Sequence, residues 1–230
     1  MSLPPLSNRL MSAVPYVREG AFVADIGTDH AYLPIYLCLK GQIRGAVAAD
    51  IGKGPLAIAA ANIRENGLSD RIPTCLSDGL EHIGPYAPTD IIVFGMGGEL
   101  IVSILHAAPW VKDASIRLIL QPMTKSEILR AYLLENGFNI IGESLTEDQG
   151  RIYQTLCVAY DGKARCDTPL GLLAGRQNLA KGGDLLCRLL ENKKKTLTEI
   201  YNAKTSAGLD AAEEHTLLKE IREYQKEMPL

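Results

Sequence analysis

The stretch V-A-D-I-G-T-D-H at residues 23–30 decides the expected fold. An apolar run ends on Asp25, Gly27 follows two residues later, and a helical pattern comes next. A buried strand that enters a glycine turn and then a helix lets the backbone approach a ligand closely at the carboxyl end of the strand. The Asp25 carboxylate can accept hydrogen bonds from an ammonium group or anchor the turn. A plain strand-to-helix turn with a capping Asp explains this stretch, taken alone, about as well.

The alternation of apolar runs and helical patterns continues to about residue 160. Strands are expected at 21–24, 45–49, 72–76, 90–94 and 116–120, with helical segments such as 57–66 and 99–107 between them. Continuous apolar strands that alternate with helices indicate a parallel sheet covered on both faces.

The end of this region predicts a different connection. After a helix at 125–136, strands at 138–145 and 152–159 are separated by six residues, which is too short for a helical crossover. The two strands should therefore pair antiparallel. Five βα units that end in an antiparallel hairpin predict an α/β fold of the class I (Rossmann-like) methyltransferase type.

The composition changes after residue 162. Leucines recur at helical spacing from 170 to 204, with a weak point or bend at Gly182-Gly183, and a second helix is expected at 211–227. Two helices joined by a short turn predict a coiled-coil-like helical hairpin. We expect a ligand-binding domain at 1–162 and a helical domain at 163–230.

Acidic residues at two further strand ends narrow the class of ligand. Asp50 ends the second strand, 25 residues after Asp25, where nucleotide-binding folds place a carboxylate against ribose hydroxyls. Asp29 stands where the dinucleotide motif has its second glycine, and a carboxylate there repels a pyrophosphate but tolerates an ammonium and a sulfonium. The pattern therefore favours S-adenosyl-L-methionine over NAD. Asp78-Gly79 follows the third strand and can meet an adenine amino group or form a solvated turn.

The fourth and fifth strands end in residues that can line the same cleft. The run Gly95-Met96-Gly97-Gly98 can touch a flat ligand or present N–H groups, or it allows tight strand–helix packing. Gln121-Pro122 can line the same pocket or form a simple turn. His30 is the sharpest candidate for chemistry, although such a histidine is more often structural. Asp29 can orient an acceptor base, lie near a cationic product, or cap the following helix.

Overall composition excludes several classes of protein. The formal net charge of −3 argues against a basic nucleic-acid binder, so nucleic-acid contact requires a local patch. Five cysteines without a C-x-x-C pair predict reduced thiols and no metal site. The N-terminus lacks a signal-peptide pattern and no apolar run is long enough to cross a membrane, so we expect a cytoplasmic enzyme.

The motifs together resemble a known family. D-I-G-T-D-H-A-Y-L-P at 25–34, D-I-x-x-G-P at 50–55, D-G-L at 78–80, G-M-G-G at 95–98 and Q-P at 121–122 resemble the bacterial tRNA (adenine(22)-N1)-methyltransferases. The resemblance covers nearly the whole chain, and its C-terminal part matches in pattern only. It implies a tRNA (adenine-N1)-methyltransferase that uses S-adenosyl-L-methionine and modifies the D arm.

The resemblance implies that Asp25, Gly27 and Asp50 bind S-adenosyl-L-methionine, with Asp78 and Gly79 near its adenine, and it places Asp29, His30 and Gly95 to Gly98 near the acceptor base. Together with the positions at the strand ends, this gives the full set of expected site residues. The cofactor would contact Asp25, Ile26, Gly27, Asp50, Ile51, Asp78, Gly79, Gly95, Met96 and Gly97. Asp29 and His30 would be catalytic. The substrate would contact Tyr32, Gly98, Gln121 and Pro122.

The helical hairpin carries a possible RNA-binding surface. Arg188 and the run Lys193-Lys194-Lys195 can grip a phosphate backbone or form a solvated helix face. We expect tRNA as the partner, no membrane, and a monomer or weak homodimer. A methyltransferase acting on a small molecule and a non-catalytic RNA-binding protein remain alternatives.

Overall fold

The computed structural model describes residues 5–227. The chain divides into two compact units, of which the first ends at Arg165 and the second begins at Cys166. The N-terminal residues in which the sequence shows no signal-peptide pattern lie mostly outside the described residues, since the description begins at residue 5. Within residues 5–227 no helix is long and apolar enough to cross a membrane, and no group of three potential metal ligands occurs.

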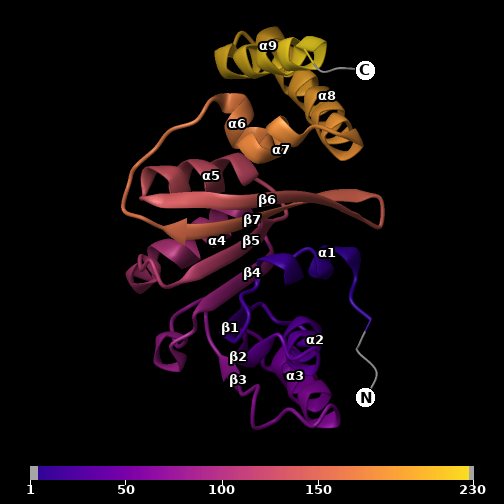
Figure 1. Ribbon diagram of the computed structural model, residues 1–230. Coiled ribbons are helices and arrows are strands. Elements are labelled where there is room, and N and C mark those ends of the chain that lie inside the picture. Colours follow the sequence, from indigo (N-terminus) through magenta and orange to yellow (C-terminus); the bar gives the residue numbers. More distant parts are fainter. Residues whose placement is uncertain (1–4, 228–230) are drawn as a thin grey trace. The chain divides into compact units, whose positions relative to one another are not determined.

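The first unit is built on a seven-stranded sheet with the order β3-β2-β1-β4-β5-β7-β6 (Figure 1). The strands are β1 (Ala21–Ile26), β2 (Ile43–Asp50), β3 (Thr74–Leu76), β4 (Asp90–Met96), β5 (Arg117–Pro122), β6 (Phe138–Asp148) and β7 (Arg151–Tyr160). β1 to β5 are parallel, and β7 runs antiparallel to both β5 and β6. The predicted methyltransferase-type sheet with a terminal hairpin is confirmed.

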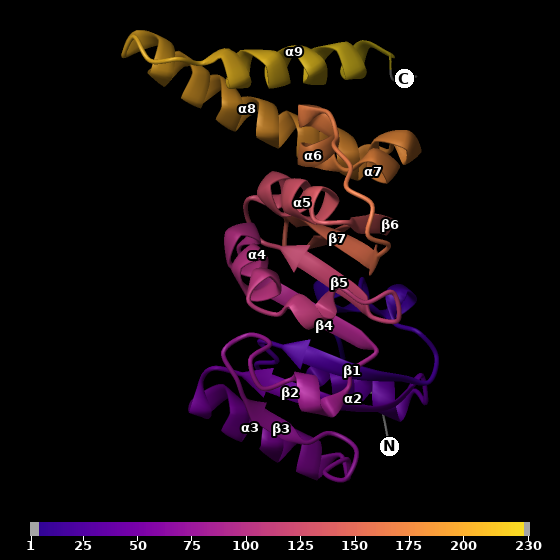
Figure 2. The same ribbon diagram turned by 90° about the vertical axis from the view of Figure 1, so that its left-hand side faces the viewer.

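Helices cover both faces of this sheet, as Figures 1 and 2 show. One face packs on α2 (Tyr32–Leu39) and α3 (Lys53–Glu65), and the other on α4 (Gly98–His106) and α5 (Ser126–Glu135). The residues of β1 alternate between the two cores: Val23 joins the first and Ala24 the second. The shorter helical segments are α1 (Asn8–Met11), η1 (Val14–Tyr16), η2 (Gly84–Tyr86) and η3 (Pro109–Val111).

The terminal hairpin is longer than expected. The six residues assigned to its connection mostly extend the two strands, and the turn proper is Gln149-Gly150. Both turn residues have positive φ, 48° and 75°, which matches the twist that favours two-residue hairpin turns. Gln-Gly is not a standard signal for such a turn, so the sequence pattern did not reveal it.

The second unit corrects the expected single helix at 170–204. Three helices occupy this region: α6 (Pro169–Ala174), α7 (Arg176–Lys181) and α8 (Asp184–Ser206). Gly175 and the pair Gly182-Gly183 separate them, with φ values of 88°, 67° and 98° that a helix cannot contain. The glycines therefore end helices rather than bend one.

The predicted helical hairpin is formed by α8 and α9 (Ala212–Glu227). Lys204 Nζ lies 2.7 Å from Glu214 Oε1, and Gln225 Nε2 donates to Glu191 Oε1 at 2.7 Å. The end of α8 thus meets the start of α9, and the first half of α8 meets the end of α9. The two helices therefore run antiparallel.

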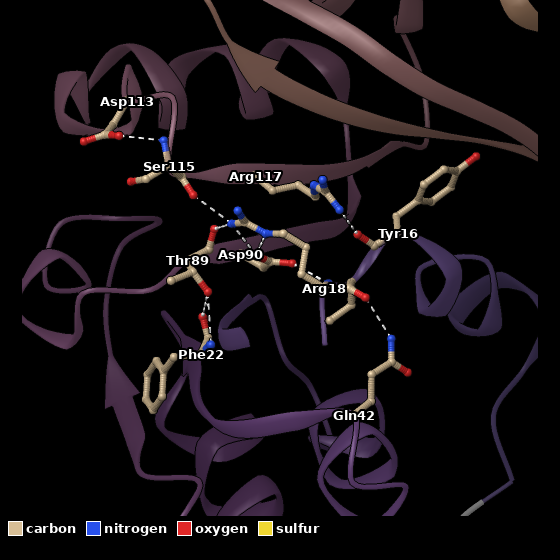
Figure 3. A network of polar contacts seen from close by, with 10 residues as sticks. Tyr16, Arg18, Phe22, Gln42, Thr89, Asp90, Asp113, Ser115 and Arg117 are labelled. Atoms are coloured by element: carbon tan, nitrogen blue, oxygen red, sulfur yellow. Dashed lines mark hydrogen bonds and ion pairs between the residues drawn. The ribbon is translucent and has the colours of Figure 1, made fainter. Parts of the chain in front are cut away.

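A polar network joins the amino ends of the strands (Figure 3). Arg18 precedes β1, and its backbone N–H and its Nε donate to the two carboxylate oxygens of the fully buried Asp90 at 2.9 and 2.7 Å. The same guanidinium also donates to the carbonyl oxygens of Thr89 and Ser115. The network thus joins the start of β1 to the starts of β4 and β5, at the edge opposite the predicted site.

Candidate functional site

The predicted site residues gather at the carboxyl edge of the parallel strands. In the sheet register Ile26 lies beside Ala49 and Val93, and Phe94 lies beside Gln121. The loops that follow β1 to β5 therefore open at one edge, where such folds bind ligands.

The turn after β1 is tightly fixed to β2. The backbone N–H groups of Gly27 and Thr28 both donate to the carbonyl oxygen of Ala49, at 2.9 and 3.0 Å. Gly27 has φ +72°, and a Cβ there would come within 2.7 Å of the Met96 methyl carbon. Glycine is required here because the turn passes so close to the end of β4.

Asp25 is a buried carboxyl group at the end of β1. The residue is 7% exposed, and Thr28 Oγ1 donates to its Oδ2 at 2.6 Å, so Asp25 anchors the turn. Burial raises the pKa of Asp25 to about 6, and the nearby Asp50 also raises it, while the Thr28 hydrogen bond and the Arg9 charge oppose this rise. No described residue donates to the other carboxylate oxygen. That oxygen is open to a cationic ligand.

Arg9 is a site residue that the sequence analysis did not identify. It lies on α1, and its carbonyl oxygen accepts from Ser12 Oγ at 2.7 Å and Gln121 Nε2 at 3.3 Å. Its guanidinium carbon lies 5.9 Å from the centroid of the Tyr153 ring. Its Nη1 is 3.3 Å from the position that a Cβ on Gly95 would occupy. Four distant segments thus bring a cation to the site, and no local pattern predicts this.

Asp29, His30 and Tyr32 form an exposed group at the mouth of the first loop. His30 Nε2 lies 3.5 Å from Asp29 Oδ1, and the His30 ring stacks on Tyr32 with centroids 5.2 Å apart. Asp29 is 72% exposed on its side chain and adopts φ 49°. α2 begins after Ala31 without a side-chain hydrogen bond to its first turn, so the alternative that Asp29 caps the helix is wrong. The roles of this group stay predictions.

The end of β2 presents one polar and one apolar residue. Asp50 Oδ1 accepts from the backbone N–H of Gly52 at 2.7 Å, which fixes the carboxylate at the edge of the sheet. Ile51 is 69% exposed. A fixed carboxylate beside an exposed apolar side chain suits a ribose next to a flat base.

The segment after β3 borders an open hollow of about 470 Å³. Asp78 lines it together with Leu100 and Ser103 of α4. Gly79 is buried, and a Cβ there would meet Ile104 at 2.9 Å, so close packing explains this glycine. Contact of Asp78 with an adenine stays a prediction.

The glycines after β4 serve different purposes. Gly95, with φ +79°, faces Arg9 as described above, and a Cβ on Gly97 would lie 3.2 Å from Thr124 Oγ1. Gly98 is buried, and a Cβ there would come within 2.2 Å of the Lys125 carbonyl oxygen. Gly98 therefore fits the packing alternative, and its contact with substrate stays a prediction.

Gln121 and Pro122, the predicted substrate contacts at the end of β5, lie below the surface in this structure. Both are buried, and Gln121 has no exposed surface. Gln121 Nε2 donates to Ser12 Oγ at 3.1 Å and Thr155 Oγ1 at 2.9 Å as well as to the carbonyl of Arg9. Gln121 thus holds α1 in place, and contact of Gln121 and Pro122 with substrate stays a prediction.

The predicted RNA-binding cations lie on α8 in the second unit. Lys194 Nζ is bonded to Glu191 Oε1 at 2.9 Å and Gln225 Oε1 at 3.2 Å, so this lysine joins α8 to α9. Lys195 and Arg188 are exposed, and Lys193 is half-buried. The run of three lysines is therefore not uniform.

The chain is similar in sequence to known methyltransferases. The family model described as a methyltransferase domain matches residues 6–156. The tRNA (adenine(22)-N(1))-methyltransferase of Bacillus subtilis is 38% identical over 164 residues, which cover 68% of this chain and 69% of that protein.

Two solved structures are similar to this chain over nearly its full length. The B. subtilis M1A22 tRNA methyltransferase TrmK has a TM-score of 0.82 and 30% identity, covering 98% of this chain and 97% of that one. M. capricolum TrmK in complex with S-adenosyl-homocysteine has a TM-score of 0.83 and 28% identity, covering 96% and 98%.

Proposed function

Because this chain belongs to the tRNA (adenine(22)-N1)-methyltransferase family, we propose that it transfers a methyl group from S-adenosyl-L-methionine to N1 of an adenine in tRNA. The adenine at position 22, in the D arm, is the proposed target. The observation that carries this proposal is the similarity over both units of the chain, combined with the open Asp25 carboxylate beside the glycine turn.

The residues at the strand ends fit this cofactor. Asp25 offers the α-ammonium group a carboxylate oxygen that no described residue binds, Asp50 offers a fixed carboxylate for the ribose, and Ile51 offers an apolar surface for the adenine. When bound, the cofactor supplies a methyl group activated by a positively charged sulfur. The charges on the chain suit such a cationic ligand.

The chemistry asks the protein mainly for positioning. N1 of adenine carries a lone pair, so the chain need not supply a strong base, and alignment of acceptor and methyl group provides most of the acceleration. The product base is cationic. We propose that the Asp29 carboxylate stabilises the developing positive charge and that His30 and Tyr32 help to hold the acceptor base.

The second unit is proposed to hold the RNA. N1 lies on the base-pairing edge, so the target adenine must become accessible, as it does in enzymes that flip bases. We propose residues 163–230 as the RNA-gripping domain, with Arg188 and the lysines of α8 contacting phosphates. This proposal also places the enzyme in the cytoplasm, as a monomer or weak homodimer.

A single reaction tests the activity. The protein is incubated with S-adenosyl-L-methionine and unmodified bulk bacterial tRNA, and digested nucleosides are identified by mass spectrometry. New 1-methyladenosine is expected, and a tRNA with adenine 22 replaced should yield none. If the cofactor binds but no nucleoside is methylated, a small-molecule acceptor replaces tRNA. If no cofactor binds, a non-catalytic RNA-binding protein is the better description.

The role of Asp29 has its own test. Asp29→Ala should lower turnover far more than affinity for the cofactor, because the carboxylate acts on the acceptor side. Asp50→Ala is the matched comparison and should mainly weaken cofactor binding. Equal losses of turnover and affinity in Asp29→Ala would exclude the assignment.

A further inference from the structure

Two oppositely charged side chains of the site, Asp25 and Arg9, lie near each other without forming an ion pair. Asp25 ends β1, and Arg9 arrives from α1, close enough for its charge to act on Asp25. No ion pair joins the two within the part of the chain that the structure describes. Thr28 holds the Asp25 carboxylate, and the Tyr153 ring lies under the Arg9 guanidinium.

The Arg9 guanidinium is positioned but not neutralised. Its backbone is held by Ser12 and Gln121, and the latter has no exposed surface. Across residues 5–227 no carboxylate or carbonyl accepts a hydrogen bond from its side chain, whereas Arg18 and Arg165 each bind an Asp. A half-buried guanidinium with unused donors next to the glycine end of β4 is suited to bind an anion.

We propose that Arg9 binds the α-carboxylate of the methionine part of the cofactor, while Asp25 binds its α-ammonium. This inference rests on the proposed function. An α-amino acid carries both charges on one carbon, so a carboxylate and a guanidinium that lie near each other without pairing can bind it at both groups. The Arg9 charge acts on Asp25 although no ion pair joins them, and Gly95 leaves room between β4 and Arg9 that a side chain would reduce.

Contact with the acceptor base is the main alternative, and charge argues against it. N1-methylation leaves the adenine positively charged, so an adjacent guanidinium would oppose the reaction. A carboxylate ligand is instead attracted to Arg9 before and after methyl transfer. Arg9 is thus a cofactor-binding residue, and Tyr153 and Gln121 are positioning residues that act through it.

The test compares ligands that differ in the carboxylate alone. Affinities for S-adenosyl-L-methionine and for decarboxylated S-adenosylmethionine are measured by calorimetry on the full-length wild type and on Arg9→Ala. The wild type should prefer the intact cofactor. Arg9→Ala should bind it about 10- to 100-fold more weakly, as expected for loss of a charge-assisted hydrogen bond, with no loss of affinity for the decarboxylated form. Arg9→Lys should fall between the two.

Arg44 provides a matched control. Its guanidinium carbon also lies 5.9 Å from an aromatic centroid, that of Phe22, but at the opposite edge of the sheet. Arg44→Ala should leave both affinities unchanged, and thermal unfolding should show that each variant is folded.

Two results would overturn the assignment of Arg9. Equal weakening of both ligands would mean that Arg9 does not sense the carboxylate. Unchanged binding with reduced tRNA methylation would place Arg9 at the acceptor. Failure of the wild type to bind either ligand is a separate result, because it rejects the proposed function as a whole.

Discussion

Asp25 shows how a single residue can favour ligand binding at a cost in stability. Its pKa is about 6 in the folded protein against an ordinary value of 3.8, so the folded state holds its proton more strongly than the unfolded state. This group therefore favours folding at low pH, and its contribution is lost as the pH rises from about 4 to about 6. At neutral pH the ionised carboxylate is a net cost.

Replacement by a neutral isostere should reverse that cost. Asp25→Asn removes the buried charge, and its amide oxygen can still accept from Thr28 Oγ1. The free energy of unfolding at pH 7.5 should rise by up to about 3 kcal/mol, as measured by denaturant unfolding. The same variant should bind S-adenosylhomocysteine more weakly. If Asp25→Asn were less stable than the wild type at this pH, hydrogen bonds or charges in the folded protein would outweigh the cost of burying the ionised Asp25 carboxylate.

The same carboxyl group should make cofactor binding depend on pH. Above pH 7 Asp25 is ionised and affinity for S-adenosylhomocysteine should be constant. Below the pKa of about 6, affinity should fall about tenfold per pH unit, because the protonated group no longer attracts the α-ammonium. Calorimetry from pH 5 to 8 measures this, and Asp25→Asn should show a flat profile. If the affinity of the wild type did not change with pH, Asp25 would not be the residue that binds the α-ammonium group.

Residues of the site differ in how far the sequence predicts them. Asp25 and Gly27 stand in one short strand-turn pattern, so their placement at the edge of the sheet followed from local rules. Arg9 comes from a four-residue helix and depends on contacts with Gln121 and Tyr153, more than 100 residues away. Such a residue is visible only once the chain is folded.

Among the elements, the network at the amino ends of the strands should support the fold and not the site. Asp90→Ala would leave the Arg18 guanidinium without its buried carboxylate partner. We expect a loss of about 1 to 3 kcal/mol in the free energy of unfolding, because Arg18 is partly exposed and keeps its two carbonyl partners, with unchanged cofactor affinity of the folded protein. Asp113→Ala is the control at the same edge, because the exposed Asp113 carboxylate is bound, within the described residues, by the backbone N–H and the side chain of Ser115 and by no cation. Similar losses in both variants would contradict a special role for Asp90.

Sequence patterns predicted the types of the elements better than their ends. The parallel strands and the final hairpin were confirmed because apolar runs and connection length fix them. The expected helix at 170–204 was wrong because leucine spacing continues across Gly175, Gly182 and Gly183, although their backbone conformation interrupts the helix. The periodicity of a segment records which side chains are buried, and this can persist through a change of helix.

At the scale of the whole molecule, cofactor binding and RNA binding should separate between the two units. Lys195→Ala on α8 should weaken tRNA binding and reduce the slope of log affinity against log salt by about 1, the loss of one phosphate contact. Affinity for S-adenosylhomocysteine should not change, since every residue proposed to hold the cofactor precedes Arg165. Binding titrations at several salt concentrations measure both quantities.

Substitutions of Lys194 and Lys219 are the controls for Lys195→Ala. Lys194 already bonds Glu191 and Gln225, so Lys194→Ala should destabilise the α8–α9 hairpin more than Lys195→Ala does and change the salt slope less. Lys219 Nζ on α9 lies 3.8 Å from Glu223 Oε1. Because this ion pair is exposed, Lys219→Ala should change neither the stability of the hairpin nor the salt slope by much. If all three variants changed the slope equally, the net charge of the second unit would attract the RNA, and no individual side chain of α8 would contact it.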